Sequence, residues 1–169
     1  MFELDQSQIQ EYQKDKPEYY RQLAMQLESL LSEDTNWVTN LSQTSAFVYQ
    51  MLPDLNWVGF YLVNSKDPNA LILGPYQGKV ACVHIPFGRG VCGTAAETLE
   101  PQLVADVHAF DGHIACDGDT NSEVVIPMMA NGKIAGVFDI DSPVHNRFDQ
   151  EDADGLTVLL KTLLASTEF

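Results

Sequence analysis

The sequence predicts an α+β fold, in which an antiparallel sheet is flanked by helices. Three observations favour it: helical apolar spacing near both ends of the chain, short β-rich runs between them, and the dipeptide Asn131–Gly132, which is typical of a tight hairpin turn. The chain has 169 residues, of which 45% are apolar. This length and composition suit one domain with a sizeable core. We expect helices to cover one face of the sheet.

Two helices are predicted before the first strand. Residues 1–16 are polar and acidic, so we set them apart as an N-terminal segment and place the folded domain at 17–169. Pro17 suits a first helical turn, because its missing N–H has no partner there. Residues 34–36 offer N-caps for a second helix, which Pro53 ends. The residues at helical spacing are Tyr20, Leu23, Leu27, Leu30 and Leu31 in the first helix, and Val38, Leu41, Ser45, Val48 and Leu52 in the second.

Strands dominate the middle of the chain. The run NWVGFYLV is rich in aromatic and β-branched residues, which favour strands. Further strands are predicted over residues 70–74, 79–85, 103–107, 123–129 and 133–139, with a short helix over 89–98 and a polar loop over 109–120. Asp149 is predicted to cap a terminal helix that presents Leu156, Leu159, Leu160 and Leu163.

The charge balance excludes some partners. Nine basic residues stand against 24 acidic ones, for a formal net charge of −15. A phosphate backbone or an anionic membrane surface requires clustered Lys and Arg, so we expect neither nucleic acid nor membrane as a partner. The start of the chain lacks a basic and apolar leader, and no apolar run approaches the length of a membrane span. These features predict a cytoplasmic protein.

Three cysteines are candidates for chemistry. Their odd number and the lack of a CxxC pair argue against a disulfide framework or a zinc ribbon. Cys82, in a predicted strand, is typical of a buried small hydrophobe. Cys92 lies in the first turn of the predicted short helix, where the helix dipole stabilises a thiolate. This position predicts that Cys92 is the most acidic of the three thiols. Cys116 lies in an acidic loop without an evident packing role, which favours a function, although its acidic neighbours should raise its pKa.

Carboxylates and aromatic residues form a second group of candidates. Asp139 and Asp141 are two residues apart on a predicted strand and therefore point to one side, and Glu123 begins the preceding strand. Such acids could bind an ammonium group, and their proximity could raise one pKa for proton delivery. Trp57 and Tyr61 also share one side of a strand and could form a pocket wall.

Metal binding is not expected. His108, His113, Cys116 and Asp117 match no common zinc spacing. The run GRGVCG lacks the Lys-Ser/Thr of a phosphate loop. We expect it to leave backbone N–H groups free at a helix start, where a carboxylate can bind.

Four blocks carry a family resemblance: NWVGFYLV, GPYQGKVACVHIPFGRGVCGTAAET, DVHAFDGHIACDGDTNSEVVIPM and GVFDIDSP. They closely resemble the free methionine-(R)-sulfoxide reductases, which are small members of the GAF fold. The resemblance covers nearly the whole chain from Pro17 and implies a GAF-like catalytic domain at 17–169. It implies a thiol-dependent reduction of free L-methionine (R)-sulfoxide, without a cofactor.

The resemblance also implies roles for the cysteines. Cys116 matches the catalytic cysteine that attacks the sulfoxide and becomes a sulfenic acid. Cys82 matches the resolving position, and Cys92 matches a third cysteine with an auxiliary role. Thioredoxin would restore the thiols. The two partners of a disulfide need Cα atoms within about 7 Å of each other, and a second thiol protects a sulfenic acid from overoxidation.

The acids and aromatic residues match family positions as well. Glu123, Asp139 and Asp141 match acids that bind the substrate and assist protonation. Trp57 and Tyr61 match aromatic residues of the pocket. Pocket carboxylates suit a free amino acid, because its α-ammonium group is absent from a peptide-linked methionine.

Some alternatives stay open from the sequence. The helix dipole favours Cys92 as the nucleophile, whereas the resemblance favours Cys116, and either Cys82 or Cys92 could resolve the sulfenic acid. The fold also hosts ligand sensors, so a GAF domain that binds a small molecule without catalysis is the alternative function. Exposed N-terminal helices would allow a homodimer.

Overall fold

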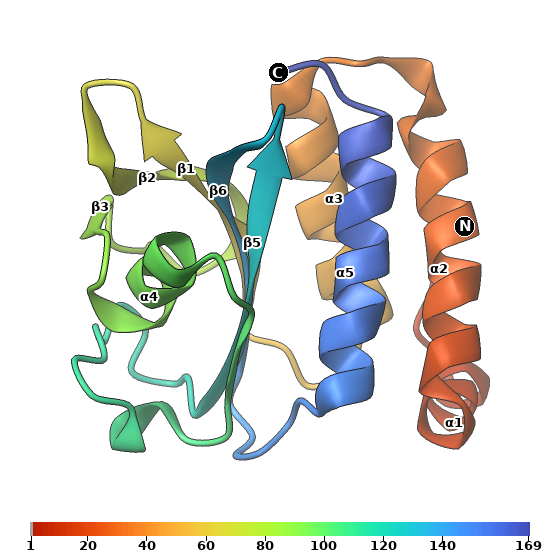
Figure 1. Cartoon of the computed structure of the whole chain (residues 1–169). Helices are drawn as coiled ribbons and strands as arrows, with labels where there is room; N and C mark the ends of the chain where they lie inside the picture. The colour runs from red at the N-terminus through yellow and green to blue at the C-terminus, as the bar shows by residue number, and fades with distance from the viewer. Residues whose placement is uncertain (1) are drawn as a thin grey trace.

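The computed structural model describes residues 2–169 and contains a six-stranded antiparallel sheet with helices on both faces (Figure 1). The strand order is β3-β2-β1-β6-β5-β4. The elements are α1 (Gln6–Lys14), α2 (Lys16–Leu30), η1 (Leu31–Glu33), α3 (Trp37–Met51), β1 (Trp57–Asn64), β2 (Asp67–Gly78), β3 (His84–Pro86), α4 (Gly90–Thr98), β4 (Gln102–Val104), η2 (Val107–Ala109), β5 (Ser122–Ala130), β6 (Lys133–Ser142) and α5 (Gln150–Ala165).

The long helices and α4 cover opposite faces of the sheet. In Figure 1, α2, α3 and α5 lie on one side of the strands, and α4 lies on the other side with the connecting loops. Side chains alternate between the two faces along each strand. On β1, Phe60 therefore joins the core beneath the long helices, whereas Trp57 and Tyr61 join a second core beneath α4. The site described below belongs to this second face.

The predicted helix starts and the hairpin turn are confirmed. The Asn36 side chain accepts a hydrogen bond from the Thr39 N–H at the start of α3. Asp149 caps α5 in a reciprocal arrangement with Asp152. Asn131 and Gly132 both adopt positive φ angles, 53° and 75°, as a tight hairpin turn requires.

Most of the N-terminal polar segment is folded and packed. Residues 6–14 form α1, which begins with a capping box between Asp5 and Gln8. Tyr12 on α1 is only 5% exposed, and its hydroxyl donates to Asp152 Oδ1 at 2.6 Å. The sequence pattern missed this packing, because α1 buries a single aromatic residue and is otherwise polar.

The strand predicted over residues 79–85 is mostly wrong. β2 continues to Gly78, where φ is +133°, and the chain then leaves the sheet until β3 begins at His84. Cys82 therefore lies in a loop and not in an apolar strand. The strand predicted over 103–107 is also shorter, because β4 ends at Val104 and Val107 lies in η2.

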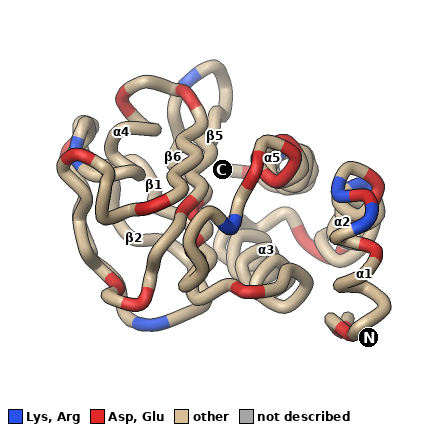
Figure 2. The backbone as a smooth tube through the Cα atoms, turned by 90° about the horizontal axis from the view of Figure 1, so that it is seen from below, with Lys and Arg blue, Asp and Glu red and all other residues tan. Residues whose placement is uncertain are grey.

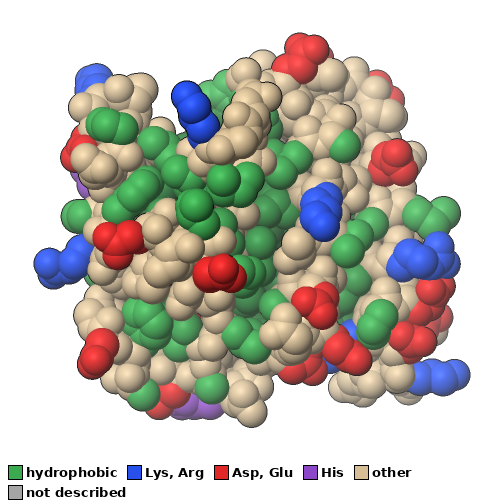
Figure 3. Space-filling model, in the orientation of Figure 1, with side chains coloured by type: hydrophobic (Ala, Val, Ile, Leu, Met, Phe, Trp, Pro, Cys, Tyr) green, Lys and Arg blue, Asp and Glu red, His purple; other side chains and the backbone are tan. Residues whose placement is uncertain are grey.

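The charges are spread over the molecule. Figure 2 shows acidic residues in many separate segments of the backbone, and Figure 3 shows acidic and basic side chains at several places on the face in view, among hydrophobic and uncharged surface. Within residues 2–169, no helix is long and apolar enough to cross a membrane. Three carboxylates are nevertheless buried, those of Glu123, Asp139 and Asp152.

Candidate active site

A pocket opens on the α4 face of the sheet. It encloses about 530 Å³ of space, including the part open to solvent. Strands β1, β5 and β6 form its floor, and the start of α4 and two loops form its walls. Its lining includes most of the predicted site residues: Trp57, Tyr61, Cys92, Cys116, Glu123, Asp139 and Asp141.

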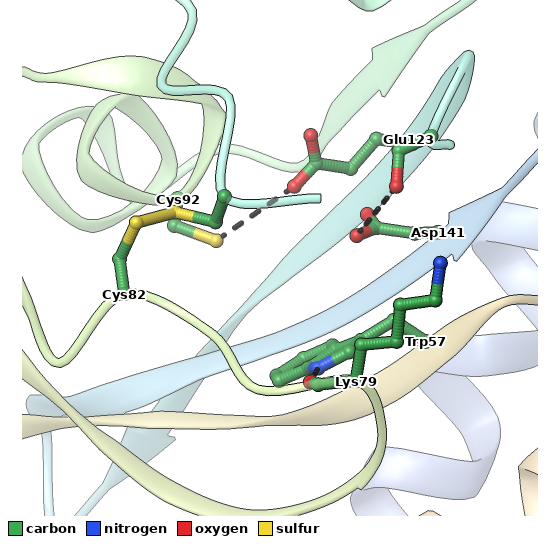
Figure 4. The surroundings of a disulfide bond; sticks show 8 residues. Trp57, Lys79, Cys82, Cys92, Glu123 and Asp141 are labelled. Carbon is green, nitrogen blue, oxygen red and sulfur yellow. Dashed lines mark hydrogen bonds between the residues drawn. A yellow bond between two sulfur atoms is a disulfide. The ribbon is translucent and has the colours of Figure 1, made fainter. Parts of the chain in front are cut away.

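Cys82 and Cys116, of which Cys116 lines this pocket, form a disulfide bond (Figure 4). Their Cα atoms are 5.5 Å apart, well inside the limit for a disulfide. Cys116 lines the pocket, whereas Cys82 lies in the loop between β2 and β3 and is not among the lining residues. The disulfide between these two cysteines can therefore form and break in the pocket that holds the acids.

The register of β5 and β6 brings the three acids together. Glu123 pairs directly with Asp141, and Asp139 lies two residues before Asp141 on the same face of β6. Glu123 and Asp139 are only 7% and 5% exposed. Oδ1 of Asp139 and Oδ1 of Asp141 are buried without a hydrogen-bond partner in the described part of the chain. Two acceptor atoms are thus available to a cationic group.

Burial changes the acidity of these carboxyl groups. Burial and the nearby Asp139 raise the pKa of Glu123 well above its ordinary value. The same two causes raise the pKa of Asp141, and burial raises that of Asp139. Acids in this environment hold protons at a pH where exposed carboxyl groups have lost them. The cluster can therefore donate a proton, or bind a cation that takes the place of one.

Cys92 is a free and buried thiol. Its Sγ lies 3.9 Å from Glu123 Oε1 (Figure 4). Burial raises the pKa of Cys92 well above its ordinary value, and the charges of Asp139 and Glu123 raise it further. The helix dipole therefore does not make Cys92 an acidic thiol, contrary to the prediction, because burial and two carboxyl groups outweigh the dipole of a nine-residue helix.

Aromatic side chains of β1 form part of the pocket floor. The Trp57 ring stacks on Tyr61 at a centroid distance of 5.8 Å and on Tyr76 at 5.1 Å. The sequence interpretation missed Tyr76, which pairs with Gly59 across β1 and β2. A Cβ atom at Gly59 would lie 2.7 Å from the Trp57 ring, so this glycine makes the stack possible.

The start of α4 borders the pocket. Gly90 has a positive φ of 63°, and Arg89, Gly90, Val91 and Cys92 all line the cavity. The first N–H groups of a helix have no intrahelical acceptor, so they can bind an anion. This position agrees with the expectation of a carboxylate site at GRGVCG.

The residues that could hold a metal differ from those considered in the sequence. Ligand atoms of Cys92, Glu123 and Asp139 lie within 4.8 Å of one another. His113 instead stacks edge-on against His108, and His108 Nε2 lies 3.1 Å from Asn121 Oδ1. The cluster of one thiol and two carboxyl groups favours protons or an ammonium group, because every member has a raised pKa.

Comparisons with known proteins agree on one family. Residues 38–163 match the GAF domain family. The chain is 48% identical to the "Free methionine-R-sulfoxide reductase" of Escherichia coli, over 92% of this chain and 94% of that protein. It is 47% identical to the protein of the same name from Saccharomyces cerevisiae, over 92% and 89%. A Neisseria meningitidis free methionine-R-sulfoxide reductase, solved in complex with its substrate, is 42% identical, with a TM-score of 0.85 and coverage of 90% of each chain.

Proposed function

The chain belongs to the GAF domain family and, within it, to the free methionine-R-sulfoxide reductases, and on this premise we propose how its pocket works. The reaction is the thiol-dependent reduction of free methionine-R-sulfoxide to methionine. We assign the nucleophile to Cys116, because its side chain lines the pocket beside the acids. Its sulfur attacks the sulfoxide sulfur, oxygen passes to Cys116 as a sulfenic acid, and methionine leaves.

The acid cluster supplies the proton that this step needs. A sulfoxide oxygen leaves only when it is protonated, and Glu123 and Asp141 have raised pKa values in the same pocket. Cys82 then attacks the sulfenic sulfur, which forms the Cys82–Cys116 disulfide and releases water. The disulfide present in the structure supports this pairing. Cys92 has an auxiliary role beside Glu123, at a sulfur–oxygen distance of 3.9 Å.

The two ends of the free amino acid have matching partners. Asp139 and Asp141 bind the α-ammonium through their Oδ1 atoms, which have no hydrogen-bond partner among residues 2–169. The backbone N–H groups at the start of α4 bind the α-carboxylate. Trp57 and Tyr61 contact the apolar part of the side chain.

We assign the reduction of the disulfide to thioredoxin. A dithiol attacks one of the two sulfurs, and exchange leaves both protein thiols reduced. Such recycling belongs to a reducing compartment, the cytoplasm. A homodimer is compatible with exposed apolar residues on α3, such as Val38 at 46% exposure, and light scattering measures its mass.

The observation that carries this function is that Cys116, bonded to Cys82, lines the same pocket as Asp139 and Asp141, whose buried Oδ1 atoms have no hydrogen-bond partner among the described residues. Its test is the release of methionine by the purified protein, followed by chromatography. Turnover is expected with the free R epimer and a thioredoxin system, and not with the S epimer or N-acetylated sulfoxide. Absence of turnover with the free R epimer would contradict the function. A sensor that binds a phosphate-bearing nucleotide is disfavoured, because the three acids repel phosphate.

A further inference from the structure

The two cysteines of the disulfide lie in separate loops. Cys82 lies between β2 and β3, and Cys116 lies between η2 and β5. Neither residue belongs to a helix or strand, so the sheet ladder does not fix the distance between their thiols. Side-chain hydrogen bonds from two consecutive residues reach both loops: Trp57, the first residue of β1, reaches one, and Asn56, which precedes β1, reaches the other.

Trp57 holds the loop that carries Cys82. Its Nε1–H donates to the backbone oxygen of Lys79 at 3.1 Å (Figure 4). The indole ring stacks on Tyr61 and on Tyr76, and Trp57 is 2% exposed. Gly78 allows this contact, because a Cβ atom there would lie 2.6 Å from Cδ1 of Trp57. The hydrogen bond therefore starts from a rigid donor.

Asn56 holds the loop that carries Cys116. Its Nδ2 donates to Oδ2 of Asp117 at 3.1 Å and to Oγ1 of Thr120 at 3.0 Å. Its backbone N–H donates to the Asp141 oxygen at 3.1 Å, which ties Asn56 to β6. Thr120 Oγ1 in turn donates to Asp141 Oδ2 at 3.4 Å. One amide thus connects the residue after Cys116 to the acid cluster.

We propose that Asn56 is a positioning residue which, with Trp57, holds the two cysteine loops at the distance where Cys82 reaches the sulfur of Cys116. Two loops tied to adjacent residues, one at the start of β1 and one just before it, lose much of their relative freedom. Less conformational entropy is then lost when the S–S bond forms, so the effective concentration of one thiol at the other rises. The ion pair of Lys79 and Asp119 joins the same loops, but both side chains are more than 60% exposed and it adds little.

The inference rests on the proposed function, but its main test requires no turnover. The disulfide is equilibrated with reduced and oxidised glutathione, and its fraction is read by alkylation and mass spectrometry. In Asn56→Ala the equilibrium constant for the disulfide is expected to fall about tenfold, which corresponds to about 30 mV for this two-electron couple. Trp57→Phe keeps an aromatic ring but loses the N–H donor, and a fall of similar size is expected.

Asn40→Ala is the matched control. Asn40 is 2% exposed, and its Nδ2 donates to Asp34, Ser166 and Thr167, which lie outside both cysteine loops. This variant is expected to lower the melting temperature without changing the glutathione equilibrium. A purely structural role for Asn56 would give the same result as Asn40→Ala, and that outcome would overturn the proposal.

A second readout follows the sulfenic acid. After one equivalent of free methionine-R-sulfoxide, dimedone should trap more Cys116 sulfenic acid in Asn56→Ala than in the wild type, because Cys82 arrives more slowly. Equal trapping together with an unchanged equilibrium would contradict the proposal. If Asn56→Ala does not fold, Asn56→Ser retains a short donor and is expected to shift the equilibrium by a smaller factor. A wild type that releases no methionine would refute the function, whereas the glutathione equilibrium would still decide the role of Asn56.

Discussion

Cys82 and Cys116 are bonded to each other across 34 residues of sequence, whereas Cys92, which lies between them in the chain, stays free and buried. This pairing favours Cys82 over Cys92 as the resolving thiol. Cys92, whose thiol lies beside Glu123, therefore takes no part in the disulfide of the pocket.

Serine variants should distinguish the roles of the three cysteines. Cys116→Ser is expected to abolish methionine release, because the nucleophile is lost. Cys82→Ser should release about one methionine per chain and then stop with thioredoxin as reductant, since the sulfenic acid is not resolved. Cys92→Ser should keep forming the Cys82–Cys116 disulfide, which peptide mass mapping detects after one turnover. A Cys92–Cys116 link in the wild type would reassign the resolving thiol.

The acid cluster should destabilise the substrate-free protein at neutral pH. The folded-state pKa values of Glu123, Asp139 and Asp141 are raised, so their contribution to stability is fully present below about pH 4 and is lost as the pH rises through the folded values. Asp139→Asn should therefore raise the melting temperature at pH 7 by a few degrees and by less at pH 4. Calorimetry at both values tests this, with Glu28→Gln, an exposed change on α2, as the control. A lower melting temperature at pH 7 would contradict the expectation.

Proton donation by Glu123 should appear in the pH profile. The raised pKa keeps this carboxyl protonated at higher pH than usual, and kcat/KM should fall as the pH rises through it. Glu123→Gln removes the proton, and kcat should fall about 10²–10⁴-fold. Single-turnover release of methionine measures this step apart from disulfide reduction. A variant with unchanged kcat would leave proton donation to Asp141.

Recognition of the ammonium group should depend on Asp141. Its Oδ1 is buried without a partner among the described residues, and a charged hydrogen bond contributes about 1.5–3 kcal/mol. Asp141→Asn should therefore raise KM for the free sulfoxide about 10–100-fold. N-acetylated sulfoxide should be a poor substrate for both proteins. Equal KM values for the variant and the wild type would show that Asp141 does not bind the ammonium group.

The contact between α1 and α5 should contribute stability without affecting catalysis. Tyr12 donates to Asp152 at 2.6 Å and accepts from Arg147 Nη1 at 2.6 Å. Tyr12→Phe leaves a buried carboxylate with one donor fewer, which costs about 1–3 kcal/mol. Thermal unfolding should shift downward while KM stays unchanged. Tyr49→Phe, at a residue 40% exposed, should leave the melting temperature almost unchanged.

Much of the fold follows from local patterns. The caps at Asn36 and Asp149 and the turn at Asn131–Gly132 depend on hydrogen bonds and φ angles within a few residues, so the sequence predicts them directly. The loop after Gly78 could not be predicted in this way. Its residues are as apolar as a strand, and it leaves the sheet where the Trp57 ring occupies the adjacent space.

Some features of the candidate site also follow from the sequence, whereas others depend on contacts between distant residues. The two-residue spacing of Asp139 and Asp141 and the four-residue spacing of Trp57 and Tyr61 predict shared faces, which the pocket lining confirms. The sequence contained no signal for the stack of Tyr76 on Trp57 or for the hydrogen bonds of Asn56. Both depend on partners that adjacent strands and a distant loop bring close.

The sequence by itself determined the types of element, the helix ends and the chemical groups available for sulfoxide reduction. Only the tertiary structure decided that Cys82 is bonded to Cys116 and that Cys92 is a weak acid. The reason is physical: secondary structure depends on neighbours along the chain, whereas the pairing and pKa of a thiol depend on burial and on charges nearby in space. The register of β5 with β6 brings Glu123 close to Asp141 and Asp139, and the packing of α4 on the sheet brings Cys92 to 3.9 Å from Glu123. The spacing of these residues along the chain predicts neither contact.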